Sequence, residues 1–198
     1  MSAPASLISG IALIAVLWLP PLRGALEAGM TTHMLVQIPL LACAGLLIAG
    51  AFEPHLAHIQ DHADRSGIAT ALIAVFASSF WMLPRALDAA LADPWMETAK
   101  FLSLPLLVGV PARLCAPRLP AIAVGFILAN LLSMWAVAGW LYRAFPAQLC
   151  NFYLIDQQVV AGGVLLAVSG LLAVLWLASF FFGGYAAAHA PSEPAAVA

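Results

Sequence analysis

The chain has 198 residues, of which 64% are hydrophobic and only 8% carry a formal charge, and its mean hydropathy is +1.02. So few charges exclude a typical water-soluble domain of this size. The formal net charge of −2, without any basic run, argues against a nucleic-acid partner. We therefore expect an all-α, polytopic transmembrane helical bundle whose first partner is the lipid bilayer.

Apolar runs separated by Pro, Gly and charged clusters predict the order of the helices. The clearest run, from Val159 to Phe182, has no formal charge and is longer than the about 20 residues that cross a hydrocarbon core. The sequence predicts about six spans, near residues 4–22, 30–52, 67–87, 97–114, 119–142 and 152–183. They form one predicted transmembrane domain, residues 1–185, followed by a disordered C-terminal tail, residues 186–198.

Two of these spans depart from a simple pattern. No Lys or Arg precedes "SLISGIALIAVLWLPPL", and "GALEAG" is a poor cleavage site, so we expect a retained first helix rather than a signal peptide. The fourth span has only a short apolar stretch between Lys100 and Arg113, interrupted by Pro105 and Pro111. It is predicted to be kinked or re-entrant.

Six spans place both termini on one side of the membrane and the loops near 23–29, 88–96 and 143–151 on the other. The six arginines then divide equally between the two sides. The positive-inside rule therefore predicts no orientation.

The internal methionines are predicted to lie on the side of the 23–29 loop, together with His33 and Cys150. Thioethers and thiols suit Cu(I), and imidazole suits either copper oxidation state. Methionine also fills irregular gaps between helices, so core packing is the alternative interpretation. The predicted metal ligands are His33, Met34, Met30, Met82 and Met96.

The stretch "GMTTHMLVQIPLL" carries the sharpest local signal. Gly29 interrupts the helical pattern, Thr31 or Thr32 can cap the next helix, and His33 then lies in the first turn of that helix. Gln37 follows four residues later, on the same helical face. The alternative is an interfacial histidine that is hydrogen-bonded to a loop.

A carboxylate and two carboxamides begin the last span in "FYLIDQQVVAGG". An ionised Asp156 at that depth costs free energy unless it is paired or reaches water. We predict that it lies near His33, with Asp156, Gln157 and Gln37 surrounding the metal ligands. The candidate partners of Asp156 are His33, Arg23, Arg85, Lys100 and Arg143. Small residues from Ala161 to Gly170 would let another helix approach closely.

A second histidine cluster, in "EPHLAHIQDHADR", lies on the opposite side. His55, His58 and His62 would share one face if the segment is helical, and three imidazoles can hold Zn(II), Cu(II) or Ni(II). The alternative is an amphipathic connector whose histidines face water.

"HM" followed by "VQ" and "PLL", and "DQQVVAG" later in the chain, resemble the CtaG-type cytochrome c oxidase assembly factors. These are polytopic bacterial membrane proteins linked to copper delivery. His33 and Met34 correspond to the family's His-Met pair, whereas Gln37 stands where a second histidine is often found. The residues that correspond to its late motif are Asp156, Gln157, Ala161 and Gly162.

The resemblance implies a copper-handling factor of the bacterial inner membrane that assists assembly or metallation of a respiratory oxidase or related copper enzyme. An oxidase subunit is the implied partner, and a homo-oligomer is also compatible. The alternatives are a non-catalytic subunit of a respiratory or oxidative complex and a small transporter. Copper is the expected cofactor, ahead of zinc. Haem is disfavoured because His33 has no second histidine at similar depth.

No catalytic motif is found in the sequence. It contains no GxSxG elbow, P-loop, Rossmann glycine pattern or HExxH. We therefore expect that the chain is not an enzyme.

Overall fold

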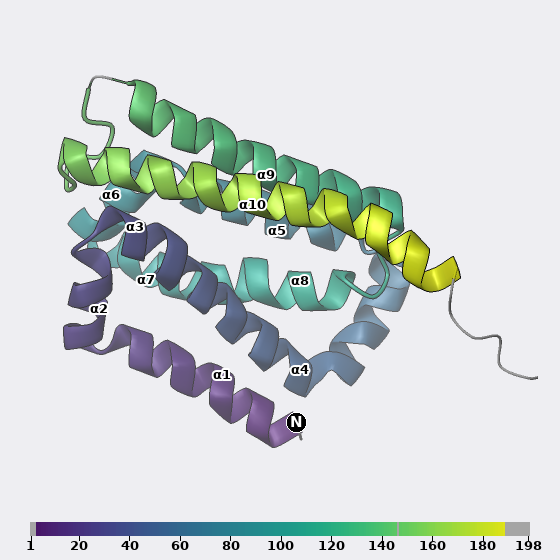
Figure 1. Ribbon diagram of the computed structural model, residues 1–198. Helices are drawn as coiled ribbons and strands as arrows, with labels where there is room; N and C mark the ends of the chain where they lie inside the picture. Colours follow the sequence, from purple (N-terminus) through teal and green to yellow (C-terminus); the bar gives the residue numbers. More distant parts are fainter. Residues whose placement is uncertain (1–2, 146, 189–198) are drawn as a thin grey trace, which may run out of the picture.

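The computed structural model describes residues 3–145 and 147–188, apart from the side chains of residues 53–57, 59–61, 63 and 182–188. All regular elements in this part of the chain are helical (Figure 1). In chain order they are α1 (Ala3–Trp18), α2 (Pro20–Glu27), α3 (Met30–Thr32), the π-helix η1 (His33–Gln37), α4 (Ile38–Ala63), α5 (Ile68–Trp81), α6 (Pro84–Ala92), α7 (Pro94–Ser103), the π-helix η2 (Leu104–Gly109), α8 (Val110–Cys115), α9 (Ala121–Ala144) and α10 (Ile155–Ala188). Residues 186–188 of the predicted tail are the end of α10, and residues 189–198 lie outside the described residues.

Four stretches of the described chain are long and apolar enough to cross a membrane: Met30–Phe52, Pro94–Cys115, Ala121–Ala144 and Ile155–Phe181. The pairs α1–α2 and α5–α6 meet the same criterion together, but they are bent by 71° and 70°. Counting each bent pair as one span gives the six that the sequence predicts. The predicted multi-pass helical bundle is confirmed.

Both bends occur at a proline. Leu19 and Leu83 are in extended backbone, and Pro20 and Pro84 begin the next helices, α2 and α6. A residue that precedes proline is disfavoured in the helical region, whereas proline suits the first turn of a helix. The predicted spans 4–22 and 67–87 are therefore each broken rather than continuous.

The fourth predicted span is one continuous helical run with a π-helical middle, so the re-entrant alternative is not observed. Pro105 lies in η2, where the amide N–H of Val110 donates to the Pro105 carbonyl. In η1, just before Pro39, the Ile38 N–H donates to the His33 carbonyl in the same way. The wider π turn accommodates a proline that would otherwise clash inside an α-helix.

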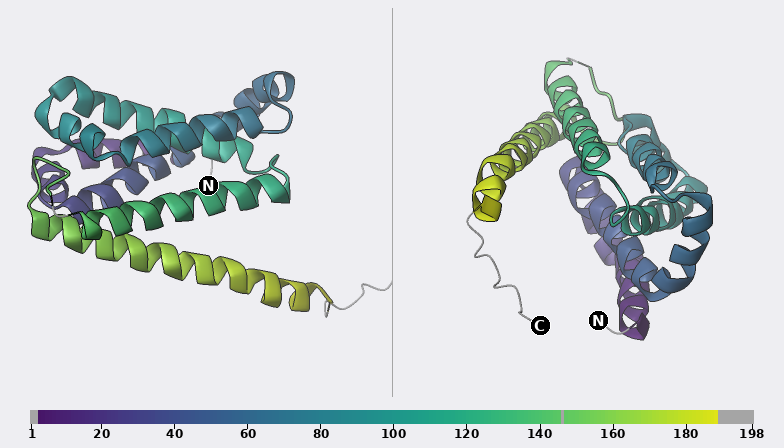
Figure 2. Two further views of the ribbon diagram at one scale, coloured as in Figure 1. Left: turned by 90° about the horizontal axis from the view of Figure 1, so that it is seen from above. Right: turned by 90° about the vertical axis from the view of Figure 1, so that its right-hand side faces the viewer.

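Helix α4 lies between α1 and the α7–η2–α8 run, whereas α9 and α10 lie side by side along one flank (Figures 1 and 2). Glycine permits the closest crossings. A Cβ atom on Gly45 would collide with the Pro105 carbonyl, and one on Gly139 would lie 2.7 Å from the Gly162 carbonyl. The predicted close approach to Gly162 is thus observed, and α9 is the helix that makes it.

The second span is longer than predicted. Helix α4 continues through the expected loop at 53–66 as far as Ala63. The histidine-rich segment is therefore helical.

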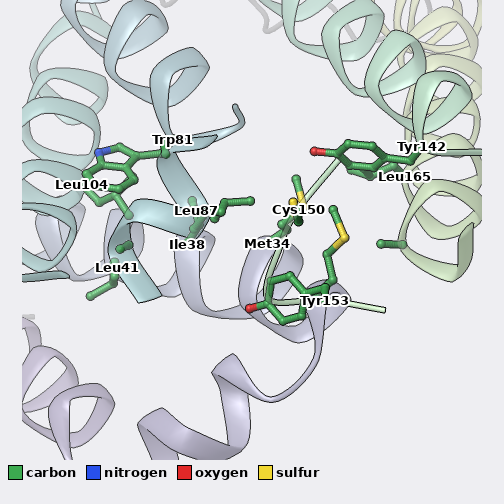
Figure 3. Close-up of a cluster of buried hydrophobic side chains, with 14 of the residues drawn as sticks. Met34, Ile38, Leu41, Trp81, Leu87, Leu104, Tyr142, Cys150, Tyr153 and Leu165 are labelled. Carbon is green, nitrogen blue, oxygen red and sulfur yellow. The ribbon is translucent and has the colours of Figure 1, made fainter. Parts of the chain in front are cut away.

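The apolar core lies at the end of the bundle where α2, α3, α6 and the loop before α10 meet (Figure 3). Contacts across this end join the three segments that were predicted to be loops on one side, two of which are mostly helical. Arg23 Nη1 lies 3.0 Å from Glu97 Oε1, and the Asn151 amide N–H donates to Asp88 Oδ2 at 2.7 Å. The predicted grouping of these loops is confirmed.

Candidate functional site

Five polar side chains from separate parts of the chain meet inside this core. We call Glu27, His33, Gln37, Lys100 and Tyr153 the buried polar cluster. The side chains of His33, Gln37 and Lys100 are fully enclosed. Ionisable groups at this position in a membrane bundle are costly unless they are paired, and they commonly mark functional sites.

Lys100 is the centre of the cluster. Its Nζ atom lies 2.6 Å from Glu27 Oε1, 2.9 Å from His33 Nε2 and 3.1 Å from Gln37 Oε1. An ammonium group has three N–H donors and no acceptor, so each N–H has one partner. The buried charge is therefore both neutralised by a carboxylate and fully hydrogen-bonded.

The lysine fixes the protonation of His33. Because the ammonium can only donate, His33 Nε2 must accept, and the imidazole is neutral with its proton on Nδ1. That nitrogen lies 2.8 Å from the Tyr153 hydroxyl, which in turn donates to the Glu27 backbone carbonyl at 3.0 Å. The hydrogen bonds therefore run in one direction from Lys100 through His33 and Tyr153.

The cluster is connected to the protein surface by further charges. Gln37 Nε2 donates to Glu27 Oε1 at 3.0 Å, and Arg23 lies 3.9 Å from the other Glu27 oxygen. The Arg23 side chain is 33% exposed, compared with 0% for Lys100, and it also pairs with Glu97. A row of alternating charges thus leads from the surface to the buried ammonium.

Local backbone features position each member of the cluster. The bend at Pro20 turns α2, and Glu27 is the last residue of that helix. His33 and Gln37 begin and end η1, and Lys100 lies on α7 just before η2. Tyr153 lies in the loop before α10. The bends and π turns are therefore the elements that bring the cluster together.

Two side chains hold the loop that carries Tyr153. Asp88 accepts from the backbone and the carboxamide of Asn151, at 2.7 and 3.1 Å. Gln158 accepts from the Leu149 amide at 2.8 Å and donates to the Tyr142 carbonyl at 3.2 Å.

Burial raises the pKa of the Tyr153 hydroxyl, and it raises the pKa of the Cys150 thiol to about 12. Both groups therefore stay protonated at neutral pH.

The four predicted methionine ligands contribute to apolar packing. Met30 and Met34 are buried in the core, and Met82 and Met96 are half-buried against it. Within the described residues, no group of three or more His, Cys, Asp or Glu side chains is arranged to hold a metal ion. Both nitrogens of His33 are already hydrogen-bonded, and a cation occupies the face of Nε2. This arrangement does not fit copper bound by His33.

The expected partner of Asp156 is not found. Asp156 is exposed in the first turn of α10, and its carboxylate forms no hydrogen bond or ion pair with any residue that the structure describes. Water and the helix N-terminus stabilise the charge there. The residue of this segment that reaches His33 is Tyr153, whereas Gln157 Nε2 lies 3.5 Å from the Ala28 carbonyl.

The segment with the second histidine cluster is helical, which is the condition for its three histidines to share one face. His58 and His62 are exposed, their ring centroids are 4.9 Å apart, and His62 Nδ1 lies 3.0 Å from the His58 carbonyl oxygen. The side chain of His55 lies outside the described part of the chain. Metal binding by this trio stays a prediction.

The sequence interpretation missed the central roles of Lys100, Glu27 and Tyr153. Lys100 did carry a signal, because it is the only lysine of the chain and lies inside a predicted span. Glu27 appears in the sequence as an ordinary loop carboxylate. Nothing distinguishes Tyr153 from an interfacial tyrosine.

Comparison of the chain with protein-family models, with curated proteins and with solved structures gives no match.

Proposed function

We propose that this chain is a non-enzymatic factor of the bacterial inner membrane that assists the assembly of a respiratory oxidase or related copper enzyme. The supporting observation is that the two segments resembling the CtaG-type factors, far apart in the sequence, lie together. His33 Nδ1 is 2.8 Å from the hydroxyl of Tyr153, in the segment that leads into "DQQVVAG". Gln157 Nε2 of that motif lies 3.5 Å from the backbone carbonyl of Ala28, five residues before His33.

We assign no copper-transfer step to His33. Lys100 Nζ occupies the position next to Nε2 that a metal ion would need, and its positive charge would repel a cation. Within the proposal, the cluster holds α2, η1, α7 and the loop before α10 in one arrangement. The role in assembly then depends on the surface that this arrangement presents to a partner protein.

A non-catalytic subunit of the same kind of complex is the second candidate. It is favoured by the closed state of the cluster, in which the ammonium and both imidazole nitrogens have internal partners. A fully satisfied network suits a permanent structural role. The two candidates differ in stoichiometry, because a subunit stays in the mature complex and an assembly factor leaves it.

The test is deletion of the gene in its host, followed by measurement of oxidase activity and copper content in washed membranes. We expect both to fall, and to recover on expression of the wild-type chain. Lys100→Met should fail to complement if the cluster is needed, whereas Arg85→Met, which removes an exposed charge outside the cluster, should complement. Unchanged activity and copper content after deletion would contradict the proposal.

Purification of the mature oxidase distinguishes the two candidates. Equimolar amounts of this chain in the active complex would identify a subunit, whereas its presence only in precursor complexes would identify an assembly factor. Elemental analysis of the purified chain tests copper binding directly. Copper that is lost on His33→Ala but retained on Arg85→Met would overturn our assignment of His33.

A further inference from the structure

A hollow lies between α5, α8 and α9, away from the buried polar cluster. Its volume is about 430 Å³, it is partly open to the surface, and its walls are mostly small or aliphatic. Representative lining residues are Ala71, Ala74, Val75, Ala112, Leu128 and Leu131. Because α9 packs mainly against α10, the space between α9 and α5 is left unfilled by side chains.

The hollow continues into a neighbouring space. A second cavity of about 160 Å³ adjoins it, and the residues that line both are Ala71, Val75, Leu119, Ile127 and Asn130. The larger volume alone is in the range of about 300–1,000 Å³ that is typical of small-molecule sites, which combine apolar walls with a few polar groups.

Asn130 supplies a polar group in both cavities. It lies near the middle of α9, a helix whose apolar composition suits a membrane span. Its backbone carbonyl accepts from Ser133, but its carboxamide has no hydrogen-bond partner within the described chain. An unpaired carboxamide in hydrocarbon costs free energy that a ligand with a complementary group would recover.

A second unpartnered donor lies on the same helix. The indole Nε1 of Trp135 is buried and has no hydrogen-bond partner among the described residues. Trp135 is one helical turn beyond Leu131, but it lines neither cavity and packs against the apolar core instead. Within the described chain, the carboxamide of Asn130 is therefore the unpaired donor that lines both cavities.

We infer that this hollow binds a quinone-type lipid, with an isoprenoid or alkyl tail along the apolar walls and a ring carbonyl that accepts from the Asn130 carboxamide. The depth of Asn130 decides the class of ligand. The polar groups of a phospholipid stay at the membrane interface, whereas a quinone ring can carry a hydrogen-bond acceptor into the hydrocarbon region. This inference does not rest on the proposed assembly function.

The test is photolabelling of the full chain in phosphatidylcholine nanodiscs with an azidobenzoquinone that carries a decyl tail. Labelled peptides are identified by mass spectrometry, with unlabelled decylbenzoquinone as competitor. We expect saturable labelling confined to the segments 71–79 and 124–135. Decylbenzoquinone should suppress it, and a short-chain phospholipid without a ring should not.

Three variants make the test specific. Asn130→Leu removes the amide at similar size and should weaken binding about 3- to 10-fold, as expected for one hydrogen bond. Ala74→Phe fills the hollow and should abolish labelling. Val137→Ala, at an exposed position on α9, should leave it unchanged. Circular dichroism melting shows that each variant is folded.

Labelling spread over all lipid-facing helices, or equal labelling in Asn130→Leu and the wild type, would overturn the inference. Competition by the ringless phospholipid would also overturn it, because the site would then accept any acyl chain.

Discussion

Lys100 Nζ lies 2.9 Å from His33 Nε2, so the only lysine of the chain is hydrogen-bonded to the histidine that the sequence marks as a metal ligand. The lysine is held there by Glu27 at 2.6 Å. Because the ammonium is fully enclosed, removing Glu27 leaves a buried charge without an anion. Removing Lys100 leaves the buried acceptors His33 Nε2 and Gln37 Oε1 without their donor.

Lys100→Ala should therefore lower the free energy of unfolding by about 3–5 kcal/mol. The measurement is reversible unfolding in mixed detergent and dodecyl sulfate micelles, followed by circular dichroism. The double variant Lys100→Met with Glu27→Gln removes both charges and should recover part of the loss. A Lys100→Ala variant as stable as Arg85→Ala would contradict a structural role of the pair.

Two tyrosines provide a matched comparison. The Tyr153 hydroxyl joins His33 to the Glu27 carbonyl, whereas the Tyr142 hydroxyl is buried without a described partner. Figure 3 labels both tyrosines. Tyr153→Phe should cost about 1–3 kcal/mol, because it leaves the His33 Nδ1–H unsatisfied, and Tyr142→Phe should be neutral or stabilising. The same unfolding assay checks both variants, and equal effects would refute the directed hydrogen-bond chain.

Helix crossings impose a size limit at two glycines. A Cβ atom on Gly45 or Gly109 would collide with the backbone of the facing helix, at Pro105 and Ala42 respectively, whereas one on Gly170 would meet open space. Gly45→Ala and Gly109→Ala should each reduce the yield of monodisperse protein in detergent, since a backbone carbonyl cannot yield as a side chain can. Gly170→Ala should be tolerated and is the control. Size-exclusion chromatography after matched expression makes the comparison.

Alkylation tests the burial of Cys150. Its pKa is raised to about 12 by burial, so at pH 8 the thiolate fraction should be about 1,000-fold below that of a thiol with a pKa of 9. In a variant that keeps only Cys150, iodoacetamide should react slowly with the folded chain and rapidly in dodecyl sulfate. The folded rate should rise about tenfold per pH unit while the fold persists. Fast, pH-independent labelling of the folded chain would show that the thiol is exposed.

Apolar runs were sufficient to predict the membrane spans, because crossing a bilayer is a requirement on length and composition. Pro20 and Pro84 also held information on where the first and third spans break, although the bend angles depend on packing. The pairing of Lys100 with Glu27 could not be predicted, since it depends on the direction that α2 takes after its 71° bend. Asp156 was expected to have a partner near His33, but its carboxylate is exposed, so it needs none.

The distance in sequence between His33 and Tyr153, 120 residues, has a consequence for the order of synthesis. During synthesis Glu27, His33, Gln37 and Lys100 are all made before Tyr153. Lys100 can therefore reach its three acceptors while His33 Nδ1 still lacks the Tyr153 hydroxyl. The hydrogen bond of His33 Nδ1 forms only when the loop before α10, which carries Tyr153, has been made. A chain that ends after α9 would therefore keep the Lys100 contacts of His33 but leave its Nδ1 without the Tyr153 partner.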